Sequence, residues 1–173
     1  MSTRSLIGIQ RDKDKFECIY CHSDGYLSYN GAMLLDHYSD KEKVEKLLKL
    51  GSISLLERKI EPNPDQEHSF CFNKRQEDVV VAYTRDRGDE MEPSVMLTLD
   101  KMSDYGWIEY SYFLDLDNKW KYIKNPDKTI RDVKEDLYKE YKSLKIKRPK
   151  DFYGFWTDEA LKKERKRQQE EEM

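Results

Sequence analysis

The first 21 residues contain two short apolar segments separated by a turn of charged residues. Residues 4–10 and 15–21 have the length of strands, and the four residues between them all carry charge. In the second segment Phe16, Cys18 and Tyr20 occupy alternate positions, and alternate side chains of a strand lie on one face. The pattern predicts an antiparallel hairpin with one face turned to a core, so the chain is expected to build a sheet.

Further segments have the composition of strands. They are residues 79–84, 94–99, 107–114 and 119–123. The last two flank the turn-like residues 115–118, which predicts a second hairpin. Residues 61–78 are polar and contain two prolines, so this stretch is expected to be a loop.

Helical periodicity is clearest between residues 39 and 51. Ser39 and Glu42 have the spacing of an N-terminal capping box, and Gly51 suits a left-handed position after the last turn. A short helix is expected over residues 31–38 and a longer one over residues 130–144. The apolar stripe of the longer helix comprises Ile130, Val133, Leu137, Tyr141 and Leu144.

The composition fits one domain with a modest core. Of the 173 residues, 37% are apolar and 39% are charged, but 12 tyrosines, 6 phenylalanines and 3 tryptophans add large buried areas. The predicted fold is therefore α+β: a single domain over residues 1–156, mainly an antiparallel β-sheet with packed helices. A charged C-terminal helix or tail follows over residues 157–173, with Thr157 as its expected N-cap.

Charge and hydropathy exclude several classes of protein. A net charge of −3 is too balanced for a general nucleic-acid binder and too weak for an acidic mimic of DNA. No apolar segment approaches the ~18 residues of a membrane span, and none follows a basic N-terminus. Three cysteines, an odd number, argue against a secreted disulfide framework. The sequence predicts a cytoplasmic protein with reduced thiols, no membrane contact and no cofactor, and it leaves self-association into a homo-oligomer open.

Two cysteines and a histidine cluster between residues 18 and 22. The C-x-x-C-H spacing matches covalent haem attachment, but the chain lacks the export signal that this chemistry requires. Zinc is the stronger metal hypothesis, because His68 and Cys71 form a second close pair beside Cys18 and Cys21. A regular strand would place Cys18 and Cys21 on opposite faces, which weighs against a shared ion, and no metal site is predicted.

The alternative interpretation of the cluster is structural. Cys18 is then a small core residue, Cys21 and His22 end the strand, and Asp24 with Gly25 makes a tight turn. His22 and Asp24 are expected close enough to bond each other or backbone amides. A Cys21–His22 nucleophilic pair is disfavoured because adjacent strand residues point apart, while an N-terminal hydroxyl nucleophile at residues 2–3 remains a minor alternative.

The segment YTRDRGDE is the second polar cluster. Arg85 and Arg87 follow an apolar strand, where two guanidinium groups can hold a phosphate or a carboxylate. The alternative is that these arginines are neutralised by Asp86 and Asp89 on a polar hairpin that turns at Gly88.

Several segments resemble a family of small uncharacterised proteins of bacteriophages and other bacterial mobile elements. The resemblance rests on MSTRSLIGIQ, IYCHSDGY, LLDHYSDKEKVEKLLKLGSIS and VVAYTRDRGDE, and it covers roughly residues 1–90. The motif of the family is matched by Tyr20, Cys21, His22, Asp24, Gly25 and Tyr26. The resemblance implies an accessory protein that redirects or blocks a host protein, including defence systems.

Two functional hypotheses follow. The first is a non-enzymatic phage or mobile-element protein that binds and inhibits a bacterial host factor, such as a defence component. The alternative is a protein that binds or hydrolyses a small ligand, a nucleotide or a nucleotide-derived signal. The candidate ligand-binding residues of that alternative are Tyr20, Cys21, His22, Asp24, Tyr26, Arg85 and Arg87.

Overall fold

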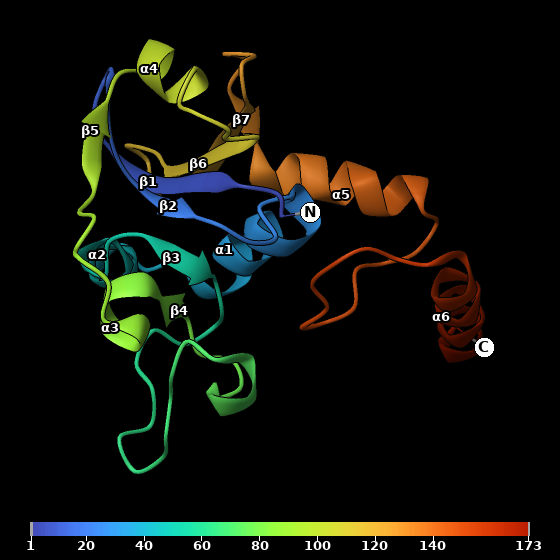
Figure 1. The fold of residues 1–173 in the computed structure, drawn as a ribbon. Coiled ribbons are helices and arrows are strands. Elements are labelled where there is room, and N and C mark those ends of the chain that lie inside the picture. Colours follow the sequence, from blue (N-terminus) through green and yellow to red (C-terminus); the bar gives the residue numbers. More distant parts are fainter. Residues whose placement is uncertain (1, 173) are drawn as a thin grey trace.

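The computed structural model describes residues 2–172, which form a single α+β domain built on an eight-stranded mixed sheet (Figure 1). The strands are β1 (Ser5–Asp12), β2 (Lys15–Cys21), β3 (Ile53–Leu55), β4 (Val81–Ala82), β5 (Val95–Leu97), β6 (Tyr110–Leu114), β7 (Trp120–Lys124) and β8 (Arg131–Asp132). The α-helices are α1 (Ala32–His37), α2 (Lys41–Lys49), α3 (Tyr83–Arg87), α4 (Leu99–Ser103), α5 (Val133–Ser143) and α6 (Asp158–Glu171). A π-helical turn, η1 (Leu27–Gly31), and a 3₁₀ turn, η2 (Phe72–Lys74), complete the elements.

The strand order is β4-β3-β2-β1-β6-β7-β8, with β5 added beside β2. The predicted hairpins β1–β2 and β6–β7 are both antiparallel, as expected from their short connections. The sheet is not wholly antiparallel, however, because β1 pairs in parallel with β6, and β2 pairs in parallel with β3. Parallel neighbours need long connections, and here the segment between β2 and β6 supplies them.

Alternation along β2 separates two cores, as the sequence predicts. Phe16 and Cys18 pack with Met102 of α4 on one face of the sheet. Ile19 and Cys21 pack on the other face with residues of α1 and α2. Tyr112, Trp120 and Tyr122 of β6 and β7 extend this second core, while Phe113 packs in the first, so aromatic side chains add buried area on both faces as expected.

The segment predicted as a strand over residues 79–84 is mostly not a strand. Only Val81–Ala82 pairs with β3, and the chain then turns into the short helix α3. The Asp86 carboxylate accepts a hydrogen bond from the Ala82 amide at 2.8 Å, and Gly88 ends the helix with φ of +79°. Local hydrogen bonding to an aspartate therefore overrides the apolar pattern that indicated a longer strand.

Two helix starts also differ from the sequence prediction. The N-cap of α2 is Asp40 rather than Ser39, and its carboxylate accepts from the Glu42 amide. Helix α5 begins at Val133 after the N-cap Asp132, so Ile130 lies outside the helix and is 51% exposed. In both cases a nearby aspartate, among the best N-capping residues, displaces the start by one to three residues.

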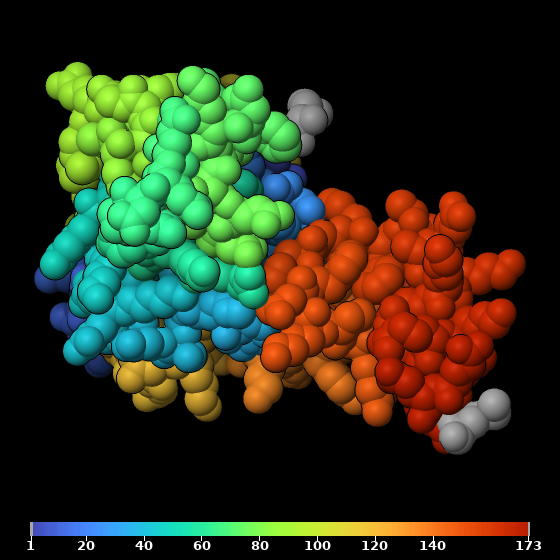
Figure 2. All heavy atoms as spheres, turned by 90° about the horizontal axis from the view of Figure 1, so that it is seen from below, coloured from blue at the N-terminus to red at the C-terminus, as the bar shows by residue number. Residues whose placement is uncertain are grey.

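The C-terminal part of the chain forms a lobe at one side of the body (Figures 1 and 2). Helix α5 packs on η1, α1 and β7, and the connection after it leads to α6. Thr157 caps α6 as predicted, accepting from the Ala160 amide at 3.1 Å, and Leu161 is the buried residue of that helix. The division into a globular domain over residues 1–156 and a C-terminal helix or tail over residues 157–173 remains a prediction.

No helix within residues 2–172 is both long and apolar enough to cross a membrane.

Replacing Gly8 by alanine is expected to destabilise the protein by about 2–3 kcal/mol, because the new methyl group overpacks the hairpin. A Cβ at Gly8 would lie 2.4 Å from the backbone oxygen of Glu17 and 2.6 Å from Cys18 Sγ. Urea unfolding of Gly8→Ala measures the effect. The control is Gly106→Ala, where the Cβ meets nothing within 4 Å and only the left-handed backbone angle costs about 1 kcal/mol. Equal losses in the two variants would contradict the packing explanation.

Candidate functional site

The end of β2 carries the first predicted site residues. Tyr20 lies on the Cys18 face and is half-buried, and its hydroxyl is 2.7 Å from His22 Nδ1. The backbone amide of His22 bonds the carbonyl of Ile53, which extends the pairing of β2 with β3. The predicted side-chain partner of His22 was Asp24 or a backbone amide. The ring instead bonds the tyrosine two residues earlier on the same strand.

The sequence predicts a tight turn at Asp24 and Gly25, and the structure bends the chain on either side of this pair, at Ser23 and Tyr26. The positive backbone angle belongs to Asp24, with φ of 55°. Gly25 is needed for space, because a Cβ there would lie 2.8 Å from both Ser5 Cβ and the backbone oxygen of Thr3. The Tyr112 hydroxyl donates to the Gly25 carbonyl at 2.6 Å, so β6 holds the turn in place. Partial burial raises the pKa of the Asp24 carboxyl.

Cys21 is fully buried on the opposite face from Tyr20. Its sulfur lies 3.5 Å from both Asn30 Nδ2 and the Ser23 carbonyl. Burial raises the pKa of the Cys21 thiol to about 11, because the thiolate would lose its hydration. A neutral, enclosed thiol is a poor nucleophile, so the geometry does not favour a Cys21-based hydrolase.

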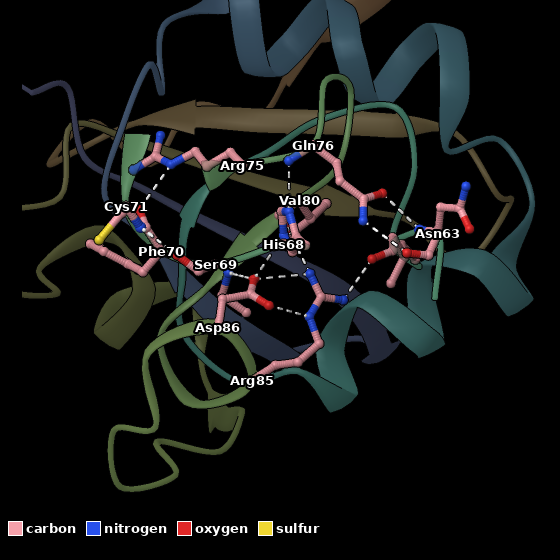
Figure 3. A network of polar contacts seen from close by, with 12 residues as sticks. Asn63, His68, Ser69, Phe70, Cys71, Arg75, Gln76, Val80, Arg85 and Asp86 are labelled. Carbon is pink, nitrogen blue, oxygen red and sulfur yellow. Dashed lines mark hydrogen bonds and ion pairs between the residues drawn. The ribbon is translucent and has the colours of Figure 1, made fainter. Parts of the chain in front are cut away.

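Arg85 belongs to a buried polar network that fastens the loop of residues 61–78 to the body (Figure 3). Its guanidinium donates at 2.6 Å to the carbonyls of both Ile60 and Val80, and at 2.9 Å to Asp86 Oδ1. The Asp86 side chain is only 3% exposed. Every strong contact of Arg85 is therefore internal, and this guanidinium is not presented to a ligand.

His68 completes the same network (Figure 3). Its Nδ1 accepts from the Gln76 amide at 3.0 Å, so the ring proton lies on Nε2. Nε2 is 3.2 Å from the Val80 carbonyl and 3.3 Å from Asp86 Oδ2. Both ring nitrogens are engaged, which assigns His68 a structural role that sequence patterns did not indicate.

Arg87 points to a different side from Arg85. It pairs with Asp89 at 2.6 Å, and its guanidinium carbon lies 4.3 Å from the ring centre of Phe70. Arg85 pairs with Asp86, so the predicted mutual neutralisation of these charges is confirmed. The arginines lie on helix α3, however, and not on the hairpin that the sequence suggested.

A small pocket of about 160 Å³ joins Tyr20 to Arg87. The other lining residues are Ser52, Tyr83, Thr84, Asp89, Glu90 and Glu92. Tyr26 lies elsewhere and stacks on Phe155 of the C-terminal segment, with ring centres 3.9 Å apart. Of the predicted ligand-binding residues, only Tyr20 and Arg87 line this pocket, and His22 lies beside it through its contact with Tyr20.

The cysteines and histidines of the zinc hypothesis do not converge. Cys18 and Cys21 lie in cores on opposite faces of the sheet, as the strand alternation predicts. Cys71 is exposed, while His68 is buried against Asp86. Within residues 2–172, no group of three or more potential ligand side chains is placed to hold a metal ion.

A broad concave surface lies in the C-terminal lobe, between α5, α6 and the connection that follows α5. It has a volume of about 570 Å³ and is called the α5–α6 groove below. Its lining comprises Leu35, Lys134, Leu137, Tyr138, Tyr141, Lys142, Lys145, Ile146, Lys147, Arg148, Gln168 and Glu172. Most of the exposed surface inside the groove is apolar, while lysines occupy its rim.

The lysines that line the groove are not neutralised by ion pairs, as is true of most lysines in the described part of the chain. Lys134, Lys142, Lys145 and Lys147 form no ion pair with any carboxylate of residues 2–172. Arg148, by contrast, is neutralised by Asp36 at 2.6 Å. The groove therefore carries a local positive charge on a chain whose net charge is −3.

Specific contacts hold the two sides of the groove together. The guanidinium of Arg165 donates to the Leu144 carbonyl at 2.9 Å, and Gln168 exchanges two hydrogen bonds with the backbone of Lys147. The Trp156 indole donates to the Tyr141 hydroxyl at 3.0 Å. These bonds link α6 to the end of α5, so the groove is a formed feature of the fold. Sequence reasoning missed it because α6 has no apolar stripe after Leu161.

Comparison of the sequence with protein-family models and curated proteins, and with solved structures, gives no match. The resemblance of residues 1–90 to a phage family therefore stays a prediction. The chemistry of the groove and of the pocket is the basis for assigning a function.

Only one of the three thiols is expected to react rapidly in the folded protein. Cys71 is exposed, whereas burial raises the pKa of Cys21 to about 11 and that of Cys18 to about 12. At pH 8 a pKa of about 11 leaves about one Cys21 in a thousand as thiolate. Ellman's reagent should titrate one thiol in the native state and three in guanidinium chloride. Rapid reaction of any thiol in folded Cys71→Ser would contradict this assignment.

Replacing Asp86 by asparagine is expected to destabilise the fold by about 3 kcal/mol, because Arg85 would lose its buried counter-charge. Chemical unfolding measures the loss, and increased proteolysis within residues 61–78 should accompany it. Asp89→Asn is the matched control, since the exposed pair with Arg87 contributes less than about 1 kcal/mol. Similar stabilities of the two variants would show that the network in Figure 3 is dispensable.

Proposed function

We propose that this chain is a non-enzymatic accessory protein of a bacteriophage or mobile element. It acts in the bacterial cytoplasm, where it binds a host protein, such as a component of a defence system, and inhibits it. The observation that carries the proposal is the α5–α6 groove. It has a volume of about 570 Å³, its exposed surface is mostly apolar, and lysines without ion-pair partners line its rim. Apolar surface enclosed by charge is typical of sites where another macromolecule docks.

The side chains of the polar clusters are engaged in contacts within the protein, which supports a binding role over a catalytic one. Cys21 is an enclosed thiol, and Arg85, Asp86 and His68 satisfy one another inside the protein. Groups that serve catalysis are usually accessible to a substrate and positioned around an open cavity. Here the reactive side chains of the sequence motifs stabilise the fold, which leaves the surface to perform the function.

The small-ligand alternative receives less support. The pocket between Tyr20 and Arg87 has a volume of about 160 Å³, whereas pockets for drug-sized ligands usually have 300 to 1,000 Å³. Asp89, Glu90 and Glu92 line it, and these acids would repel a phosphate. Arg85 is turned into the network on the other side, so a forked grip by both arginines is not available.

Co-purification from bacterial hosts tests the proposal. Tagged protein expressed in a panel of hosts with known defence systems should retain one host protein in a near-stoichiometric complex. Phage plating on the host that supplies this partner should then rise when the protein is expressed. The matched control is a Tyr138→Asp variant, which should not retain the partner. The substitution places a charge in the α5–α6 groove at a side chain that is 68% exposed and does not support the core.

The proposal would be wrong if no host yields a stoichiometric partner while the purified protein turns over a nucleotide or a nucleotide-derived signal. It would also be wrong if a partner is captured but neither its activity nor phage plating changes.

A further inference from the structure

We propose that the occupant of the α5–α6 groove is an acidic amphipathic helix of the partner protein. The inference rests on the protein-binding function proposed above and specifies the chemistry of the segment that binds. Charge, spacing and apolar surface each contribute to it.

The charge of the rim selects an acidic segment. Lys134, Lys142, Lys145 and Lys147 lack ion-pair partners among residues 2–172, and they outnumber Glu172, the acidic residue of the groove lining. Four unpaired cations around one concave surface attract carboxylates and repel basic segments. Long lysine side chains can also cover apolar surface with their methylene groups while the ammonium groups reach a ligand.

The spacing of the rim fits a helix laid beside α5. Lys134 and Lys142 are eight residues apart on that helix, which corresponds to about 12 Å along its axis. Acids separated by seven or eight residues on a neighbouring helix span the same distance, a little over two turns. Lys145 and Lys147 continue the rim beyond the end of α5, so a helix of about three to four turns would meet all four cations.

The floor of the groove supplies apolar contacts at helical spacing. Leu137, Tyr138 and Tyr141 follow one another at the i, i+1, i+4 positions of α5, and Ile146 extends the floor. Tyr138 is 68% exposed and is the side chain with most area left to bury. Amphipathic helices commonly bind in such grooves through apolar residues at i, i+3, i+4 and i+7. Large aromatic side chains are the usual energetic centres of protein interfaces.

A second copy of the chain fits the groove less well than a separate partner. Helix α6 ends in the acidic run of residues 170–172, but it has no apolar side chain after Leu161 among the residues described. Acidic charge without an apolar stripe would leave the floor uncovered. A single-stranded nucleic acid is also a poorer fit, because stacking needs several exposed aromatic faces and Tyr138 is the only largely exposed aromatic of the lining residues within 2–172.

A designed peptide tests the groove directly with the full-length protein. The probe is an 18-residue fluorescent helix with leucines at i, i+3, i+4 and i+7 and glutamates on its flanks, a length near that of common globular helices. Fluorescence anisotropy should show saturable binding that weakens as salt is raised. A scrambled peptide of equal composition, and a version with every glutamate replaced by lysine, should each bind at least tenfold more weakly.

Charge-reversal variants locate the binding surface. Lys142→Glu with Lys145→Glu should weaken binding of the acidic peptide at least tenfold, and Tyr138→Asp should do the same without altering the rim lysines. The matched control is Lys163→Glu with Lys166→Glu, which reverses two exposed charges of α6 that do not line the groove. Circular dichroism confirms that each variant is folded, and the control should bind as the wild type does.

The inference is overturned by any of four results, of which the first three concern binding of the probes. They are absence of saturable binding to the acidic peptide, equal binding by the groove variants and the wild type, and tighter binding of a single-stranded oligonucleotide than of the peptide. Concentration-dependent dimerisation that Lys142→Glu with Lys145→Glu abolishes would also overturn it, since a second copy would then occupy the groove.

Failure of this inference is distinguishable from failure of the proposed function. If a host protein is captured equally by the wild type and by the Lys142→Glu, Lys145→Glu variant, the binding function stands and the groove assignment is wrong. If the peptide binds in the groove but the protein inhibits no host protein and does not change phage plating, the groove assignment stands and the proposed biological role is wrong.

Discussion

The parallel pairing of β1 with β6 is the constraint on which the rest of the structure depends. Residues 5–9 pair with residues 110–114, so the first strand of the chain is bonded on its second edge by a strand that follows about a hundred residues later. Everything between β2 and β6 must therefore leave the centre of the sheet and return to it. The intervening segments form α1 and α2 on one face, the strands β3 to β5 on the β2 side of the sheet, and α4 on the other face (Figure 1).

The turn after β2 connects this central pairing to the helical side of the protein. Tyr112 of β6 donates to the carbonyl of Gly25, and the amide of Asn30 bonds the carbonyl of Asp24. The motif YCHSDGY thus lies where β2, β6 and the turn η1 meet. Hydrogen bonds from β6 and η1 satisfy the backbone carbonyls of the motif there. Buried polar groups need partners, which explains why a sequence that resembles a reactive cluster forms a structural one.

The C-terminal lobe has a different character from the sheet. Its contacts are aromatic stacks and hydrogen bonds to backbone carbonyls, such as Trp156 on Phe152 and Arg165 to Leu144. Leu161, the buried side chain of α6, adds apolar packing because it joins a separate cluster with Leu137, Tyr141 and Ile146. The arrangement leaves the lysines of α5 and the apolar surface beside them open to another molecule.

Local features of this protein were determined by the sequence itself. The β1–β2 hairpin, the opposite faces of Cys18 and Cys21, the cap of α6 and the pairing of arginines with neighbouring aspartates all follow from residues close together in the chain. Their physical basis is local: strand alternation, capping and short-range charge attraction. The tertiary structure alone decided the parallel partner of β1, the His68–Asp86 contact and the α5–α6 groove. Each of these depends on long-range packing that brings distant segments together, and no spacing within a single segment records that proximity.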